Sequence, residues 1–442
     1  MKYFFIFFFS VNLWSQDFFN VELLANWTNT DIVVGPGNVR FSDLWGFKHK
    51  GQKYAVVGST EGSHFLKVDR SKISEVQFEP GRFAGLLVQH RDFKKYKNYI
   101  YGVCDEGNSS LQIFDISYLP DSVHKVYDSS EHFTICHNIF IDTNKAKLYA
   151  CGPDNYGMKI LDIVDPEQPK LLKNFTKVDY VHDCFVTNDT AFLNAGPDGL
   201  RVFDFSNNNV DFEIGVLTSY QEKGYNHSGW MDESRSYYCF IDETKGKRIK
   251  FCRIDNGIDN IKVNALFGTK DATDFIAHNI SLYNGYAFVS YYNKGLRIFD
   301  LTNQPIKEVG FYDTYDTTSS YKLHGAWGVF VFQDEEIVLI SDRQGGVYSF
   351  YFPMTLFRLQ TEFHQAWGTP FIDESSKILI NPENSEDLFF EIYNVLGEIV
   401  FKKQRMYNWL NIPLNLSPGQ YIYRVSSENW EDAYSGKFII LH

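Results

Sequence analysis

The chain has 442 residues, of which 44% are hydrophobic and 17% aromatic, and its formal net charge at pH 7 is −13. The apolar content excludes a wholly disordered chain, and the length suits a large repeat domain joined to a small one. The acidic balance argues against nucleic acid or an anionic membrane as the main partner, because both need a basic face.

The first residues predict an export signal. Lys2 is followed by an apolar run at residues 4–9, and then by the polar Ser15 and Gln16. This run is too short to cross a bilayer and has the order of a secretory signal peptide, so we expect residues 1–15 to be removed. No later segment of the sequence is apolar for long enough to be a transmembrane span. These features predict a protein that is secreted or held at the outer cell surface.

A short phrase of alternating apolar residues ending in Asp recurs along residues 17–352. Its copies end at Asp69, Asp115, Asp162, Asp204, Asp255 and Asp300. Other strand-like segments and turns lie between the copies, so each unit contains four strands in about 45 residues, which is typical of a β-propeller blade. The hydrophobic period is two, which excludes a helical solenoid. We interpret the repeated Asp as a residue that caps the following turn.

A second repeated feature is the residue at which the innermost strand of each unit is expected to begin. Its seven copies begin at Trp45, Arg91, His137, His182, His227, His278 and Trp327. We therefore predict an all-β fold, a seven-bladed β-propeller followed by a small β-sandwich, with six or eight blades as alternatives. Residues 20–26 resemble the outer strand of other units, so we expect them to complete the last blade and close the ring, which hides the sheet edges.

The pattern changes after the propeller. Residues 353–370 look like a linker, and residues 371–442 contain alternating strands separated by Leu-Gly and Pro-Gly turns. This predicts a compact C-terminal β-sandwich, small for an independent domain but large enough to fold.

Six cysteines have no CxxC spacing, which argues against a structural zinc site built on them. An exported protein can form disulfides. Cys239 and Cys252 flank a turn and would face each other on neighbouring strands if the chain folds about it. Two free buried thiols are the alternative.

The most suggestive chemistry is a column of four histidines at one register of successive blades, His137, His182, His227 and His278. Neutral imidazoles there could bind one divalent cation, such as zinc, manganese or calcium, near the channel mouth. Asp43, Asp92 and Asp183 are candidate helpers, and Asn138, Asp183 and Asn279 follow three of the histidines and could fix their tautomers. The alternative is a structural role, in which each imidazole bonds a backbone carbonyl or a neighbouring blade.

The remaining candidates carry less chemistry. We expect the other histidines to be surface or loop residues: His49, His64, His90, His124, His132, His324, His364 and His442. We interpret Trp45, Trp230 and Trp327 as packing residues rather than a sugar platform. No catalytic residue is assigned, because no nucleophile elbow, HExxH, P-loop or dinucleotide motif is present.

Both halves resemble known families. The tail is similar to the type A sorting domain of the type IX secretion system, through Asn381-Pro382, Asn394-Val-Leu-Gly-Glu398 and Pro418-Gly-Gln-Tyr421. The body resembles the choice-of-anchor B family, related to LVIVD-repeat proteins, through phrases such as Tyr225-Asn-His-Ser-Gly-Trp230 and Lys294-Gly-Leu-Arg-Ile-Phe-Asp300. The tail departs from the family by reading Ile-Asn-Pro-Glu at its entry. The resemblance implies an exported propeller that engages the secretion machinery through its tail.

These observations favour a non-enzymatic secreted binding or scaffold protein whose extracellular ligand is a protein or a glycan. A metal-dependent hydrolase with its cation at the channel mouth is the alternative. A purely structural propeller, such as the cap of an adhesin stalk, is a third interpretation.

Overall fold

The computed structural model describes residues 18–354, apart from 208, 256, 271–273 and 316–322. In the tail it describes residues 371–372, 377–379, 388–404, 409–411, 416–417, 419–427 and 434–440. The expected signal peptide, most of the expected linker, and His364 and His442 lie outside these residues.

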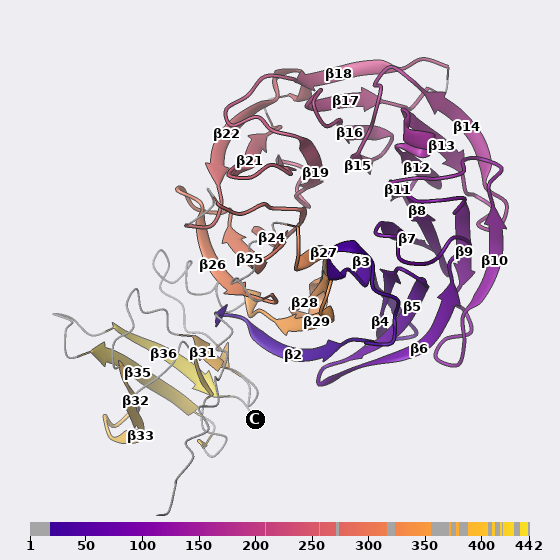
Figure 1. Ribbon diagram of the computed structural model, residues 1–442. Helices are drawn as coiled ribbons and strands as arrows, with labels where there is room; N and C mark the ends of the chain where they lie inside the picture. Colours follow the sequence, from indigo (N-terminus) through magenta and orange to yellow (C-terminus); the bar gives the residue numbers. More distant parts are fainter. Residues whose placement is uncertain are drawn as a thin grey trace, which may run out of the picture.

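Seven antiparallel sheets stand around a central axis, as the repeat predicts (Figure 1). The first three sheets are formed by β3 (Phe41–His49), β4 (Gln52–Ser59), β5 (Gly62–Asp69) and β6 (Lys72–Pro80); β7 (Arg91–Tyr96), β8 (Tyr99–Cys104), β9 (Leu111–Asp115) and β10 (His124–Ser129); and β11 (Asn138–Asp142), β12 (Lys147–Cys151), β13 (Met158–Asp162) and β14 (Lys170–Phe175). The next two are formed by β15 (Asp183–Thr187), β16 (Thr190–Asn194), β17 (Leu200–Asp204) and β18 (Phe212–Leu217); and β19 (Asn226–Met231), β20 (Tyr237–Asp242), β21 (Ile249–Arg253) and β22 (Lys262–Phe267). The last two contain β23 (Asn279–Tyr283), β24 (Tyr286–Tyr291), β25 (Gly295–Asp300) and β26 (Lys307–Tyr312); and β27 (Ala326–Phe332), β28 (Ile337–Asp342) and β29 (Gly346–Tyr351). The innermost strand of each sheet lines the channel.

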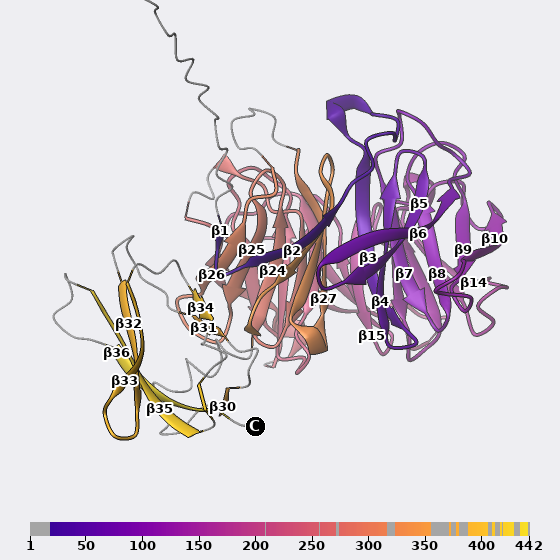
Figure 2. The same cartoon turned by 90° about the horizontal axis from the view of Figure 1, so that it is seen from below.

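The N-terminal strands belong to the last two sheets. β1 (Phe18–Phe19) pairs with β26, and β2 (Glu22–Trp27) pairs with β29, opposing Glu22 to Tyr351 and Trp27 to Val347. Figure 2 shows the ring edge-on, with β1 and β2 following one another along its outside. The seventh sheet therefore takes its outer strand from the opposite end of the propeller sequence, which closes the ring without an exposed edge at β29.

The repeated Asp caps a turn in the predicted way. Its Oδ1 accepts a hydrogen bond from the backbone N–H two residues later at four of the copies, with distances of 2.8–2.9 Å. The glycine before the third strand has a positive φ, +78° at Gly199 and +64° at Gly295. A Cβ there would lie 2.5 Å from Leu217 O and 2.2 Å from Tyr312 O, so only glycine lets the third strand start this close to the outer strand.

The core lies between the sheets rather than inside any one of them. Aromatic and aliphatic side chains on the facing surfaces of neighbouring sheets form successive buried clusters around the ring. Tyr101 of β8 and Leu148 of β12, for example, are fully buried in one such cluster. Each sheet therefore depends on both neighbours for burial, as expected of a propeller.

All six cysteines are buried and free. The expected facing of Cys239 and Cys252 is wrong, because Cys239 pairs with Phe251 and Cys252 with Tyr238 in the β20–β21 ladder. The register is one residue away from the one that would oppose the two sulfurs. Since alternate residues of a strand point to opposite faces, the thiols enter different core clusters.

The C-terminal part forms a small second β-domain. Its larger sheet has five strands in the order β30 (Phe371–Ile372), β36 (Tyr434–Ile440), β35 (Gly419–Ser427), β32 (Leu388–Asn394) and β33 (Ile399–Gln404). A second sheet pairs β31 (Lys377–Leu379) with β34 (Trp409–Asn411). Within the described residues, no helix has the length and apolar character needed to span a membrane.

Candidate functional site

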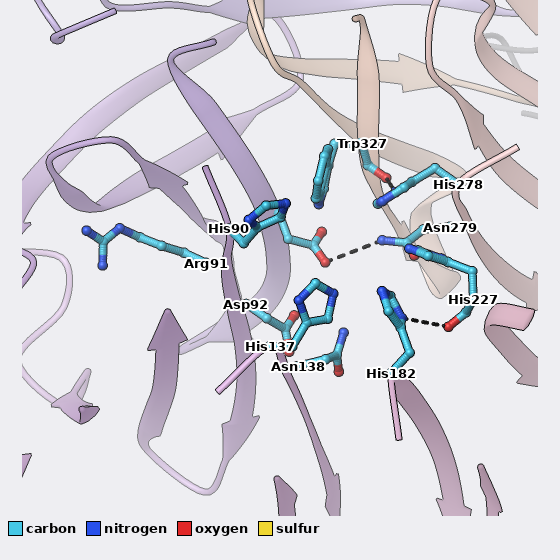
Figure 3. A pocket seen from close by; sticks show the side chains of 11 residues that line it. His90, Arg91, Asp92, His137, Asn138, His182, His227, His278, Asn279 and Trp327 are labelled. Carbon is cyan, nitrogen blue, oxygen red and sulfur yellow. Dashed lines mark hydrogen bonds between the residues drawn. The ribbon is translucent and has the colours of Figure 1, made fainter. Parts of the chain in front are cut away.

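Six aromatic rings from six successive sheets form a closed circuit at one end of the channel (Figure 3). The circuit comprises His90, His137, His182, His227, His278 and Trp327. Neighbouring ring centroids are 4.1–5.5 Å apart all the way round, and the step from Trp327 back to His90 is 5.3 Å. We call these six side chains the imidazole ring; it includes the four histidines that the sequence singled out.

The fifth histidine, His90, was not predicted as a site residue. It lies in the loop before β7, as expected of a surface or loop residue, and it also lines the pocket beside His137. In this sheet Arg91 occupies the sequence position equivalent to the four histidines. Its side chain points away from the ring and donates hydrogen bonds to Ser59 O and Phe83 O. The imidazole of His90 takes the place that Arg91 leaves. Trp45, which we align with the same register, does not line this pocket and lies deeper in the channel.

Hydrogen bonds fix how the imidazoles face the pocket. Nδ1 of His182 donates to His227 O at 3.0 Å, and Nδ1 of His278 donates to Trp327 O at 2.8 Å. Nδ1 of His137 lies 2.8 Å from Asp105 Oδ2, and His90 Nδ1 bonds Glu106. Because Nδ1 of His182 and of His278 must donate to a carbonyl, each of these rings when neutral keeps its lone pair on Nε2. The structural role weighed above is thus played by Nδ1, and it leaves Nε2 of the same rings available as a ligand.

Neighbouring side chains do not fix these tautomers in the way we expected. Asp183 accepts from the N–H of Cys184 at 2.6 Å, and Asn279 Nδ2 faces Asp43. Backbone carbonyls of the next sheet bond Nδ1 of His182 and His278 instead. The carboxylates of Asp105 and Glu106 bond Nδ1 of His137 and His90. These two acidic residues follow β8 directly and were not identified from the sequence.

The three imidazoles on one side of the ring are neutral at pH 7. Burial lowers the pKa of His227 to about 4 and lowers the pKa of His182 and of His278 well below the usual value. At His137 burial also lowers the pKa, but the adjacent Asp105 carboxylate outweighs it and the pKa is raised. Neutral imidazoles are the form that binds metal ions.

Glu243 brings a carboxylate to two of these rings. Its Oε2 lies 3.8 Å from His227 Nε2 and its Oε1 lies 3.9 Å from His278 Nε2. The hydroxyl of Tyr292 donates to the same carboxylate. One ligand atom from each of His227, Glu243 and His278 lies within 4.8 Å of the others. Glu243 follows β20 and belongs to no repeated phrase, so no sequence pattern identified it.

This spacing is wider than that of ligand atoms around a bound zinc ion. Zinc bonds of about 2.0–2.1 Å place tetrahedral ligand atoms about 3.4 Å apart. The three candidate ligand atoms lie within 4.8 Å of one another, so the side chains would move closer together on binding an ion. Nδ1 of His227 is buried without a hydrogen-bond partner among the described residues.

The pocket has the size of an ion rather than of a sugar or peptide. A water-sized sphere has about 20 Å³ to move in, and one water molecule needs about 10–15 Å³ on this measure. Its floor is formed by the next inward-facing residues of the innermost strands, which include Asp43, Asp92, Asn138 and Asn279.

Those floor residues belong to a buried charged layer. Lys94 Nζ contacts Asp92 at 2.8 and 3.0 Å, and Asp92 Oδ2 also accepts from the N–H of Ile139. Burial, together with the charge of Asp92, raises the pKa of Asp43 to about 8; burial raises the pKa of Asp183 to about 7. Both oxygens of Asp92 are thus engaged by Lys94 or backbone, and the three carboxylates form a layer of their own beneath the imidazoles.

Aromatic side chains fill the channel below the charged layer. Trp45 and Trp230 come from opposite sides of the ring, with centroids 6.5 Å apart. Phe140, Phe185 and Phe330 pack against them at 5.1–6.0 Å. Trp45 and Trp230 are packing residues, as expected, and Trp327 is only 8% exposed. These aromatic contacts link the innermost strands below the pocket.

The other histidines lie outside the ring. His64, expected at the surface or in a loop, is a further correction: it is buried in β5, where its ring nitrogens lie 2.9 Å from Ser59 Oγ and 3.1 Å from Glu75 Oε2. His124 is exposed on β10, and His132 lies in a loop with its Nε2 3.0 Å from Pro169 O.

Comparison with known proteins supports the repeat. Residues 276–314 match the LVIVD repeat. The match begins just before His278 and spans β23–β26, so one histidine of the ring sits at the start of the matched unit. The likeness covers one of the seven sheets, and no curated protein matches the chain.

Solved structures support the fold. A protein from Lactobacillus plantarum has 15% identity and a TM-score of 0.51, covering 68% of this chain and 88% of that one. The periplasmic gluconolactonase of Pseudomonas aeruginosa has 10% identity and a TM-score of 0.51, covering 69% and 90%. At these identities the likeness concerns the β-propeller architecture alone.

The charged layer makes stability depend on pH. In the unfolded chain Asp43 ionises near pH 4, whereas in the folded protein it holds its proton until about pH 8. Its contribution to stability is therefore complete below pH 4 and is lost as the pH rises to about 8. Asp43→Asn should gain stability relative to the parent as the pH rises from 4 to 8, because the amide does not ionise. Urea unfolding of the parent and the variant at several pH values measures this, and a stability difference that does not change with pH would contradict it.

Proposed function

We propose that this protein is an exported β-propeller that binds one divalent transition-metal ion at the mouth of its channel. The observation that supports this best is the convergence of His227, Glu243 and His278 on one point of the imidazole ring. Two neutral imidazoles line the small pocket, and the carboxylate of Glu243 beside them completes a set of three candidate ligand atoms within 4.8 Å of one another. No side-chain proton has to be removed before the imidazoles bind.

The donor set selects among the three cations considered above. Calcium takes six to eight oxygen ligands, whereas this site offers two nitrogens and one carboxylate. Imidazole with carboxylate suits zinc, and manganese to a smaller degree. Zinc is therefore the first ion to test.

Charge around the mouth favours a cation. Asp105, Glu106 and Glu243 each lie beside a histidine of the ring. The whole chain carries a formal charge of −13. The Arg343 guanidinium lies 4.5 Å from the centroid of the Trp327 ring and offsets part of this negative charge. The three carboxylates still favour a cation over an anion beside these histidines.

A titration of the metal-free full chain with zinc tests the proposal. We expect one equivalent to bind and to be retained through gel filtration, with a rise in the thermal midpoint because the ion binds the folded state. Protein that retains no zinc and whose midpoint does not change would refute the proposal. A parallel titration with calcium should show weaker binding.

Metal-dependent hydrolysis is the second candidate, and one observation favours it. Three protein ligands leave a zinc ion a position for water, which is the arrangement of catalytic sites. The zinc-loaded chain can be assayed against chromogenic carboxylic and phosphoric esters. Turnover that disappears in Glu243→Gln would support an enzyme; zinc binding without turnover on any of these esters would support a binding protein.

We further propose that the C-terminal domain directs the chain to the cell surface. The support is the resemblance of residues 377–442 to type IX sorting domains and of the body to the choice-of-anchor B family. Removing residues 371–442 should leave the propeller in the periplasm of a host that has this secretion system. Cell fractionation with an antibody to the propeller measures the effect, and normal surface exposure of the truncated chain would contradict it.

A further inference from the structure

Two thiols from adjacent sheets meet in the core behind the imidazole ring. Cys151 ends β12 in the third sheet, and Cys184 lies in β15 of the fourth sheet. Their Sγ atoms are 3.4 Å apart, and the two residues are 0% and 2% exposed. They share the core cluster between these sheets.

The contact is unlike that of the other cysteines. Cys104 Sγ contacts Glu106 at 3.6 Å, and Cys136 Sγ contacts the carbonyls of Cys151 and Asn138 at 3.2 and 3.3 Å. Cys239 and Cys252 occupy opposite faces of their sheet. Only Cys151 and Cys184 bring two sulfurs into contact among the described residues. A disulfide needs about 2.05 Å between the sulfurs, so the two Sγ atoms, 3.4 Å apart, have to approach by about 1.4 Å for the bond to form.

We propose that Cys151 and Cys184 form a disulfide that clamps the third sheet to the fourth. The bond forms by exchange with a small-molecule or protein disulfide: both thiols lose their protons, one S–S bond forms here, and the oxidant is reduced to two thiols. Burial in the folded protein keeps both thiols from solvent, so the exchange belongs to the folding stage, before the sheets have packed. The oxidising environment rests on the export proposed above.

The proposed disulfide would lie next to two histidines of the imidazole ring. His137 donates its backbone N–H to Cys151 O at 3.2 Å, and Cys184 lies two residues after His182. The clamp therefore lies beside the backbone of His137 and His182, whose ring centroids are 4.1 Å apart. A covalent bond here holds that side of the imidazole ring at fixed spacing.

Peptide mapping tests the bond directly. The full chain is produced with export to an oxidising periplasm, denatured in acid and alkylated without reduction. We expect one linked pair of peptides containing Cys151 and Cys184, lighter than the two free peptides by two hydrogen atoms, and alkylation of the other four cysteines. Six alkylated cysteines, or a linkage between any other pair, would overturn the proposal. Because oxidation is supplied by the host, this result does not depend on whether the native chain is exported.

Thermal unfolding with and without dithiothreitol supplies the second measurement. The parent midpoint should fall by several degrees on reduction, to the midpoint of Cys151→Ala with Cys184→Ala, which should itself not respond to the reductant. The matched control is Cys239→Ala with Cys252→Ala, whose midpoint should still fall on reduction. A parent midpoint that does not respond to reductant would contradict the clamp.

Discussion

Replacing Glu243 with Gln is expected to weaken zinc binding by about 100-fold or more, equivalent to roughly 3 kcal/mol. The carboxylate lies 3.8 and 3.9 Å from Nε2 of His227 and His278, and it is the only charged group of the three-residue site. Gln keeps the size of the side chain but removes the charge that would neutralise part of the ion. His278→Gln should lose a similar factor, because Nε2 is its only ring nitrogen not bonded to protein.

Calorimetric titration with zinc measures these losses, and other histidines supply the controls. His132→Gln should bind as the parent does, since that histidine lies outside the imidazole ring and faces Pro169 O. His137→Gln and His182→Gln discriminate between two positions for the ion. If these two lost zinc while Glu243→Gln kept it, the ion would lie among the imidazoles on the other side of the ring, and the three-residue site would be wrong.

The fold followed from two regularities that are local in the sequence. Strand alternation and the phrase ending at Asp115, Asp162, Asp204 and Asp300 repeat at about one blade length, and these four copies share the same turn cap. The structure shows seven such sheets. The predicted pairing of two cysteines was wrong because the strand register differs by one residue from the expected one. In the β20–β21 ladder Cys252 lies opposite Tyr238 rather than Cys239. Sequence spacing alone does not determine that step.

The site was predictable only where it repeats. His137, His182, His227 and His278 occupy one register, so a period found in the sequence brings them together in the ring. His90 was not predicted because Arg91 occupies the sequence position that is histidine in four other blades. The Arg91 side chain points away from the ring because it donates hydrogen bonds to Ser59 O and Phe83 O. Glu243 comes from a loop after β20, and its position depends on tertiary packing that no repeat encodes. An acidic residue directly after the second strand, as at Asp105 and Glu243, is the one signal that could have found it.

Deleting residues 18–27 is expected to cost at least about 5 kcal/mol, comparable with the whole stability of many domains. β2 supplies the outer strand of the seventh sheet, and Val21 is buried beside Phe350 in the core next to it. Trp27 reaches the first sheet, where its ring lies 5.6 Å from Phe41. The deletion therefore removes a strand and loosens the junction between the last sheet and the first, leaving the edge of β29 open to aggregation.

A permuted chain separates loss of the strand from loss of closure. Glu22 lies opposite Tyr351, so residues 18–28 can be placed after residue 352 through a short turn, which makes β2 the hairpin partner of β29 as in the other sheets. Circular dichroism during heating should show a midpoint close to the parent's for the permuted chain and a collapse for the deletion. A deleted chain that unfolds within a few degrees of the parent would mean that β2 does not hold the ring together. If the permuted chain were as unstable as the deletion, closure by the distant N-terminal strand, rather than the presence of a fourth strand, would be what stabilises the seventh sheet.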